Sequence, residues 1–185
     1  MISLLRRNAV GDFVVAQKYL LDLFTPHTWQ QFLGHGANVS GFKLRQQKLA
    51  QERGAPGTIF LCYLVGLSRW CGALEIISGP FIDDTPIFYD SDDPFVVRFK
   101  VSSLVTLEIE QSPQMTAPEV WDHLSITNAV ERGSFGWAQS IGFRASLRVI
   151  PQSDGDFLLN LLRQQQNAPR HYPLSKDDER KLSAL

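Results

Sequence analysis

The stretch GTIFLCYLVGLSRWCGALEIIS, residues Gly57 to Ser78, decides the fold of this chain. It holds two apolar segments, Thr58–Val65 and Trp70–Ser78, joined by four turn residues. Two strands with so short a connection predict a β-hairpin. Because Ile59–Val65 is an unbroken apolar run, we expect both faces of that strand to be buried, as in a barrel or a sheet covered by helices.

The two cysteines of the chain, Cys62 and Cys71, fall on opposite strands of this hairpin. If Val65 pairs with Trp70 around the turn, Cys62 faces Ala73, so this register predicts no disulfide. Two buried free thiols are typical of a reducing compartment. The sequence also shows no long apolar run and no signal peptide, so we expect a cytoplasmic protein that does not enter the membrane.

The composition is that of a globular protein with one main domain. The 185 residues are 44% hydrophobic and 20% charged, and the formal net charge is −1. A net charge near zero gives no overall attraction for phosphate, so any nucleic acid would have to bind through a local basic patch. We expect an N-terminal arm over residues 1–15, a domain over 16–166 and a C-terminal tail over 167–185.

Apolar patterning around the hairpin predicts alternating strands and short helices. A strand over Lys18–Phe24 leads into a helix with Thr25 as its N-cap and Pro26 at its first position. A basic helix is expected from Lys43 to about Arg53. The later expected elements are an acidic loop over Gly79–Pro94, a strand over Phe95–Glu108, a short helix after Ala117, a strand over Phe143–Ile150 and a final helix capped by Ser153.

The common catalytic and metal-binding patterns are missing from the sequence. The four histidines form no i,i+4 pair and there is no CxxC, so the usual zinc spacings are not met. The aspartates of the loop over Gly79–Pro94 could hold a metal, but Arg98-Phe99-Lys100 stands where a restriction-type nuclease needs Glu-x-Lys. The sequence therefore predicts a non-enzymatic protein with no cofactor and no metal site.

Aromatic residues at the ends of strands, beside the basic helix, indicate a different function. A flat apolar slot flanked by cations suits a flipped-out base, because stacking contributes about 1–3 kcal/mol per base. A methyl group on the base would bury further apolar area in such a slot. Ordinary core packing is the alternative for each aromatic residue. The candidates are Phe42, Trp70, Phe88, Tyr89 and Trp137.

The order of these pieces resembles the EVE domain, a member of the PUA-like superfamily that includes the YTH readers of methylated RNA. The resemblance extends from about Lys18 to Leu162. It implies an α/β fold of the α+β type, with a PUA-like curved mixed β-sheet or barrel surrounded by short helices. The segments that carry the resemblance are Val39–Arg53, Pro56–Val65, Gly72–Glu75, Ser78–Phe81, Pro94–Phe99 and Phe143–Leu162.

The resemblance implies recognition of a modified base in DNA or RNA by a pocket between the first helix and the central strands. Ser40 and the backbone after Leu21 match positions that bind the base edge. This chain departs from the YTH readers in carrying Phe rather than Trp at position 42 and an acidic loop around 88–89. Together with the aromatic residues and the basic helix, the resemblance leads us to expect these pocket residues: Ser40, Phe42, Trp70, Phe88 and Tyr89. The expected phosphate-binding residues are Lys43, Arg45 and Lys48.

EVE domains are often fused to nuclease modules, so the resemblance implies a nuclease or another effector protein as a partner, and no membrane. Two alternatives stay open at this point. The same pocket could serve a small-molecule module for a nucleoside or metabolite, or a protein-interaction module. The acidic loop could instead belong to an enzyme that acts on nucleic acid, in which case Asp83 and Asp84 would bind its metal.

Overall fold

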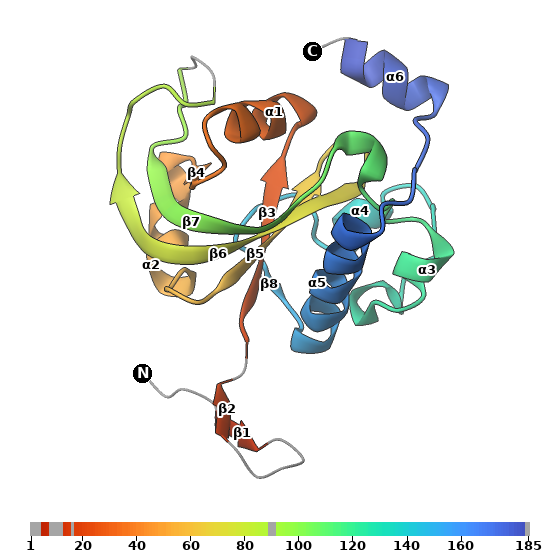
Figure 1. The fold of residues 1–185 in the computed structure, drawn as a ribbon, viewed down its shortest axis with the longest axis horizontal. Helices are drawn as coiled ribbons and strands as arrows, with labels where there is room; N and C mark the ends of the chain where they lie inside the picture. The colour runs from red at the N-terminus through yellow and green to blue at the C-terminus, as the bar shows by residue number, and fades with distance from the viewer. Residues whose placement is uncertain (1–4, 8–12, 16, 89–91, 184–185) are drawn as a thin grey trace.

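The computed structural model describes residues 5–7, 13–15, 17–88 and 92–183. Its centre is a six-stranded mixed sheet with the strand order β4-β7-β6-β5-β3-β8 (Figure 1). Two further strands, β1 and β2, pair with each other in an antiparallel ribbon. The strands are β1 (Leu5–Arg7), β2 (Phe13–Val15), β3 (Tyr19–Phe24), β4 (Val39–Phe42), β5 (Ile59–Leu64), β6 (Arg69–Ile82), β7 (Val97–Thr106) and β8 (Val149–Ile150).

Short helices surround this sheet, as the sequence predicts for the α+β class (Figure 1). The first of them begins as expected, because Thr25 is the N-cap and Pro26 occupies the first turn. The α-helices are α1 (Pro26–Gly34), α2 (Gln47–Arg53), α3 (Pro118–Trp121), α4 (Trp137–Ser140), α5 (Gln152–Asn167) and α6 (Lys176–Ser183). The 3₁₀ turns are Leu44–Gln46, Ile109–Gln111 and Ser125–Thr127.

The predicted hairpin is confirmed as β5 and β6, but its register is not the expected one. Tyr63 rather than Val65 lies opposite Trp70, and Cys62 lies opposite Gly72. The pairing shifts between Cys62 and Tyr63, because Cys71 is an extra residue on β6. Both cysteines are buried and free, as expected. All six residues of β5 are buried, which confirms that both faces of this strand are covered.

The sheet separates two apolar cores. On one face, α1 and α2 pack through Trp29, Phe32 and Ala50 against the inward side chains of the strands. On the other face, α5 packs through Leu158 and Leu162. Because β5 pairs in parallel with β3, the chain must cross over between them, and α1, β4 and α2 form that crossover. The crossover brings β3, α1 and β4 together at one end of the sheet.

Two elements near the C-terminal end differ from the prediction. The strand expected over Phe143–Ile150 is reduced to β8, because Leu147 has a φ of 66° and interrupts the extended backbone. The side chains of Phe143 and Leu147 enter different cores, so the segment turns instead of running straight. Helix α5 begins at Gln152 after Pro151, and Ser153 therefore lies inside its first turn and does not cap it.

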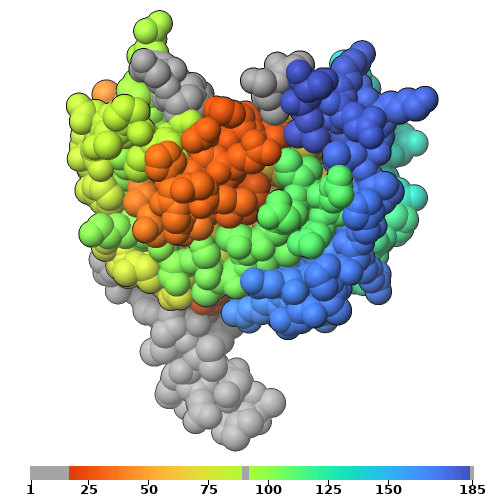
Figure 2. Space-filling view, turned by 45° about the horizontal axis from the view of Figure 1, so that its top comes forward, coloured from red at the N-terminus to blue at the C-terminus, as the bar shows by residue number. Residues whose placement is uncertain are grey.

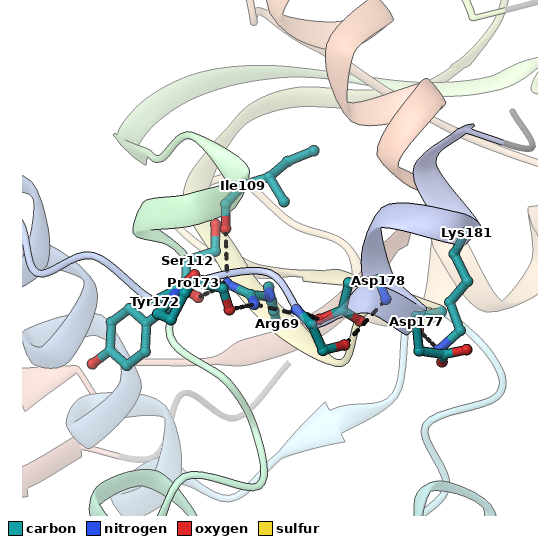
Figure 3. Close-up of polar contacts among 10 residues, drawn as sticks. Arg69, Ile109, Ser112, Tyr172, Pro173, Asp177, Asp178 and Lys181 are labelled. Atoms are coloured by element: carbon teal, nitrogen blue, oxygen red, sulfur yellow. Dashed lines mark hydrogen bonds and ion pairs between the residues drawn. The ribbon is translucent and has the colours of Figure 1, made fainter.

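The chain after α5 returns to the domain and is held there by Arg69 (Figure 3). The Arg69 side chain is fully buried, and its guanidinium donates to the carbonyl oxygens of Tyr172 and Pro173 at 2.8 and 2.9 Å. It also donates to the carbonyl of Ile109 and forms an ion pair with Asp178 of α6 at 3.6 Å. In Figure 2 the surface of α1 lies between the yellow-green segment that includes the end of β6 and the dark blue of α6.

Candidate base-binding cavity

A small cavity lies where β3, β4 and α1 meet the segment between β6 and β7. Its volume is about 10 Å³, which is room for about one water molecule. A buried carboxyl group, a hydroxyl group and aromatic rings meet in its wall, a combination that suits a planar ligand with polar edges. The lining residues are Asp22, Leu23, Phe24, Thr28, Gly41, Phe88 and Phe95.

Asp22 is the ionisable group of this wall. It lies in the middle of the apolar strand β3 and is 2% exposed. The hydroxyl of Ser40 on β4 donates to Asp22 Oδ2 at 2.6 Å. Burial raises the pKa of the Asp22 carboxyl to about 7, and the hydrogen bond from Ser40 opposes that rise. At neutral pH this carboxyl is therefore divided between its acid and its carboxylate forms.

The groups that face Asp22 from the neighbouring strands carry no charge. Cys62 lies opposite Asp22 on β5, and Cys71 lies on β6. Burial raises the pKa of both thiols well above the usual range, so both stay protonated.

Asp22 itself is not among the site residues predicted from the sequence; at this place the prediction named the backbone after Leu21. An aspartate inside the apolar run YLLDLF was the available signal for a functional carboxyl group.

Gly41 lets two aromatic rings approach the backbone of β4. A Cβ atom at this position would lie 2.6 Å from the Phe88 ring and 3.1 Å from Phe95 Cβ. The centroids of the Phe88 and Phe95 rings are 5.3 Å apart, with an interplanar angle of 66°. Lys43 Nζ lies 3.9 Å from the centroid of the Phe95 ring, which is a cation–π contact. The glycine is thus a geometric requirement of this cavity.

Two of the predicted pocket residues, Ser40 and Phe88, come together here. Phe88 lines the cavity, and Ser40 reaches it through its hydrogen bond to Asp22. Phe42 is next to Gly41 in sequence but points into the core, with its ring centroid 5.5 Å from that of Phe60. Tyr89 lies outside the described residues.

The expectation that Trp70 shares a slot with Phe42 is wrong. Trp70 is fully buried on the opposite face of the sheet, where it packs on Tyr63 and Phe143 with ring centroids 5.0 and 5.5 Å away. Its indole N–H points to Met115 Sδ at 3.3 Å. The physical reason is the extra residue at Cys71, which reverses the side of the sheet that the preceding side chain faces.

The predicted phosphate-binding cations each have a carboxylate neighbour. Arg45 Nη1 lies 2.9 Å from Asp93 Oδ2, and the ammonium of Lys43 lies 3.8 Å from the same oxygen and also donates to the Asp93 carbonyl. Lys48 is paired with Glu52 at 4.0 Å along α2. Arg45 and Lys48 are largely exposed, whereas the Lys43 side chain is mostly buried. Phosphate would therefore compete with these carboxylates.

The loop between β6 and β7 is held by a residue that the sequence did not single out for this purpose. Arg98 is buried, its Nη1 lies 3.0 Å from Asp83 Oδ2, and its Nε donates to the carbonyl of Phe95 at 3.1 Å. Hydrogen bonds from Thr85 and the charge of Arg98 lower the pKa of Asp83.

Within the described residues, no group of three His, Cys, Asp or Glu side chains is placed to hold a metal ion.

No family model and no curated protein matches this sequence. Among solved structures, the Pho92 YTH domain in complex with m6A has a TM-score of 0.56 at 15% identity, over 80% of this chain and 87% of that one. The Mmi1 YTH domain in complex with RNA has a TM-score of 0.55 at 13% identity, over 86% and 91%. The fold is that of a YTH domain.

A third structure with the YTH fold is the domain of Zygosaccharomyces rouxii MRB1 in complex with N6-methyladenosine RNA, with a TM-score of 0.52 at 15% identity. It covers 79% of this chain and 86% of its own. At such identities the likeness concerns the fold, which is a mixed α+β arrangement around an open sheet. In the part of this YTH-like chain that the structure describes, no helix has the length and apolar character needed to cross a bilayer.

Proposed function

We propose that the protein recognises a modified nucleobase in DNA or RNA without catalysing a reaction on it, and that it belongs to the EVE branch of the PUA-like superfamily. The observation that carries the proposal is the buried pair of Asp22 and Ser40 at a cavity walled by Phe88 and Phe95. Aromatic rings provide a stacking surface, and a carboxyl with a hydroxyl provides hydrogen bonds for a base edge. Complexes of YTH domains with RNA and m6A support this reading.

The cavity has to widen before a base can enter it. Small-molecule pockets are commonly about 300–1,000 Å³, far larger than the space between these rings. The wall that can give way is formed by Phe88 and Phe95, because both belong to the segment between β6 and β7, whereas Asp22 and Gly41 belong to hydrogen-bonded strands of the sheet. Binding would therefore move Phe88 and Phe95 apart while the polar end of the cavity stays in place.

The test is binding of oligonucleotides that each carry one modified base, measured by fluorescence anisotropy at two salt concentrations. We expect selective binding to one modified base that weakens as salt rises, because phosphate contacts release counterions. Phe88→Ala should reduce that binding by about 1–3 kcal/mol. Phe143→Ala is the matched control, because it removes an equally buried ring on the other face of the sheet. Equal binding by both variants would contradict the proposal.

One observation favours a second candidate, a module that binds a free nucleoside or metabolite. Lys43 and Arg45 are already engaged with Asp93, and the chain as a whole has a net charge of −1. A free nucleoside would bind in the same cavity with little dependence on salt. Selective binding whose affinity is the same at both salt concentrations would favour this candidate over a nucleic-acid reader.

The domain limits, the location and the effector partner stay predictions. The proposed division is an arm over residues 1–15, a domain over 16–166 and a tail over 167–185, in a cytoplasmic protein that acts with a nuclease or another effector. The contacts of Arg69 with Tyr172 and Pro173 argue that the folding unit extends beyond residue 166. Limited proteolysis followed by mass spectrometry would define the stable limits.

A further inference from the structure

We propose that Asp22 binds the edge of the base as a protonated carboxylic acid, and that the ligand therefore presents one hydrogen-bond donor beside one acceptor. This inference rests on the proposed function, since it names the chemistry of the same cavity. It adds a residue and a protonation state, and it predicts a dependence on pH that a merely structural carboxyl would not confer.

The geometry leaves Oδ1 and one lone pair of Oδ2 of this carboxyl available. Asp22 lines the cavity, and its Oδ2 is engaged by the hydroxyl of Ser40. Within the described residues, the Asp22 side chain receives no hydrogen bond other than the one from Ser40. Oδ1 and the second lone pair of Oδ2 remain for a ligand that enters between the rings of Phe88 and Phe95, so Oδ1 can carry the acid proton while Oδ2 accepts. A buried carboxyl that keeps a free oxygen at a cavity is a typical feature of a binding site.

The surroundings favour the acid form when a ligand excludes water. Asp22 faces the hydroxyl of Ser40 from β4 and neutral thiols from β5 and β6, while Thr28 of α1, whose hydroxyl is bonded to the backbone of Thr25, lines the same cavity. Lys43 is not one of the lining residues; its ammonium lies over the Phe95 ring and contacts Asp93. With no positive charge among the groups that shift its pKa, the Asp22 carboxyl stays close to half protonated at pH 7.

The protonation state decides which edges fit. A carboxylic acid donates through its O–H and accepts through its other oxygen, whereas a carboxylate only accepts. The acid therefore pairs with a ring nitrogen beside an exocyclic amino group, or with a ring N–H beside an exocyclic oxygen. The carboxylate instead pairs with two adjacent donors, such as the ring N–H and amino group of guanine. An alkyl group added to the base must not replace the hydrogen atom or block the lone pair that bonds to Asp22.

The decisive comparison is between wild type and Asp22→Asn, across pH 6 to 9, with the modified oligonucleotide that binds best. The amide of asparagine has one donor and one acceptor at every pH, so it imitates the acid form. We expect the wild-type affinity to fall by up to about tenfold per pH unit above pH 7, because the protein must take up a proton to bind. Asp22→Asn should bind with the same affinity across this range.

Ser40→Ala provides a second variant with a signed expectation. The hydrogen bond from Ser40 lowers the pKa of Asp22, so its removal should move the midpoint of the pH dependence upward. Asp122→Asn changes an exposed carboxyl far along the chain and should leave the wild-type pH profile in place. Infrared difference spectra of the free protein should show a protonated carboxyl at pH 6 that is lost at pH 9 and missing from Asp22→Asn.

The outcomes separate the two proposals. Binding of a modified base with no pH dependence, or strong loss of binding in Asp22→Asn at pH 6, would overturn the role of Asp22 while the proposed function stands. A midpoint that stays in place in Ser40→Ala would assign the titration to another group and also overturn it. If none of the modified oligonucleotides binds at any pH, the proposed function fails, and this inference fails with it.

Discussion

The hydroxyl of Ser40 on β4 donates a hydrogen bond of 2.6 Å to Asp22 on β3, although β4 and β3 are on opposite sides of the sheet order. Three strands separate them in that order, so the sheet must curve strongly to bring the two side chains together. The curvature closes one core around the pair and places an acid where solvent cannot reach it. This pair is the polar centre of the candidate site.

Burial of Asp22 should make the fold less stable as pH rises from about 4 to 7. Its pKa is about 7 in the folded chain and 3.8 when exposed, so the folded state holds the extra proton between these values. Stability then falls as pH rises, by about 4 kcal/mol in total at 1.36 kcal/mol per pKa unit, and levels off above pH 7. We expect Asp22→Asn to gain stability over wild type across this range in urea unfolding. A constant difference from pH 4 to 8 would contradict the expectation.

Gly41→Ala should destabilise the domain by about 1–3 kcal/mol, because the added Cβ would overlap the Phe88 ring at 2.6 Å. Gly34→Ala is the matched control, since nothing lies within 4 Å of its added Cβ at the end of α1. Thermal unfolding followed by circular dichroism compares the two variants. If Gly41→Ala melts at the same temperature as Gly34→Ala, the close approach of the rings is not a constraint on this strand.

Arg69→Ala should cost about 3–5 kcal/mol, because it leaves Asp178 and several carbonyl groups without their buried partner. Asp177→Ala changes the adjacent residue of α6, whose exposed carboxylate pairs with Lys181, and should cost much less, because solvent screens such a pair. Urea unfolding midpoints measure both. Similar losses in the two variants would show that the chain after α5 adds little to the stability of the domain.

Asp93→Asn should strengthen binding of oligonucleotides by up to about fivefold, because the exposed ion pair with Arg45 is worth about 0–1 kcal/mol and Arg45 would meet phosphate with less competition. Arg45→Gln should weaken binding and reduce its dependence on salt by about one phosphate contact. Anisotropy titrations at several salt concentrations measure both effects. If the affinity of Arg45→Gln depends on salt as strongly as that of the wild type, Arg45 does not contact phosphate.

Local patterns in the sequence were enough to predict the hairpin and the start of α1, because Thr25-Pro26 and the apolar run of β5 act through neighbouring residues. The side on which Trp70 lies could not be predicted in the same way. Strict alternation from Leu74 would place it on the face of Phe42, but the extra residue at Cys71 moves it to the other face. The residue types around a bulge do not mark it clearly. It nevertheless decides which face of the sheet each preceding side chain of β6 lies on.

The candidate site was predictable in part for the same reason. Gly41 and Phe88 belong to segments whose order along the chain resembles that of the EVE domain, so this part of the site could be expected from the sequence. The pairing of Asp22 with Ser40 depends instead on how far the sheet curves, a property of the whole fold. An acid in an apolar strand indicates only that some partner exists, and the sequence does not say which strand provides it.

Arg69 also has a consequence for how the chain is made. Two of its carbonyl partners lie 103 and 104 residues later in the sequence. During synthesis on a ribosome, β6 emerges long before Tyr172 and Pro173. The hydrogen bonds from the Arg69 guanidinium to these two residues therefore cannot form until late in translation. The domain can therefore complete the surroundings of Arg69 only after nearly all of the described chain has been translated, and a product that ended before Tyr172 would keep this cation without two of its carbonyl partners and without Asp178.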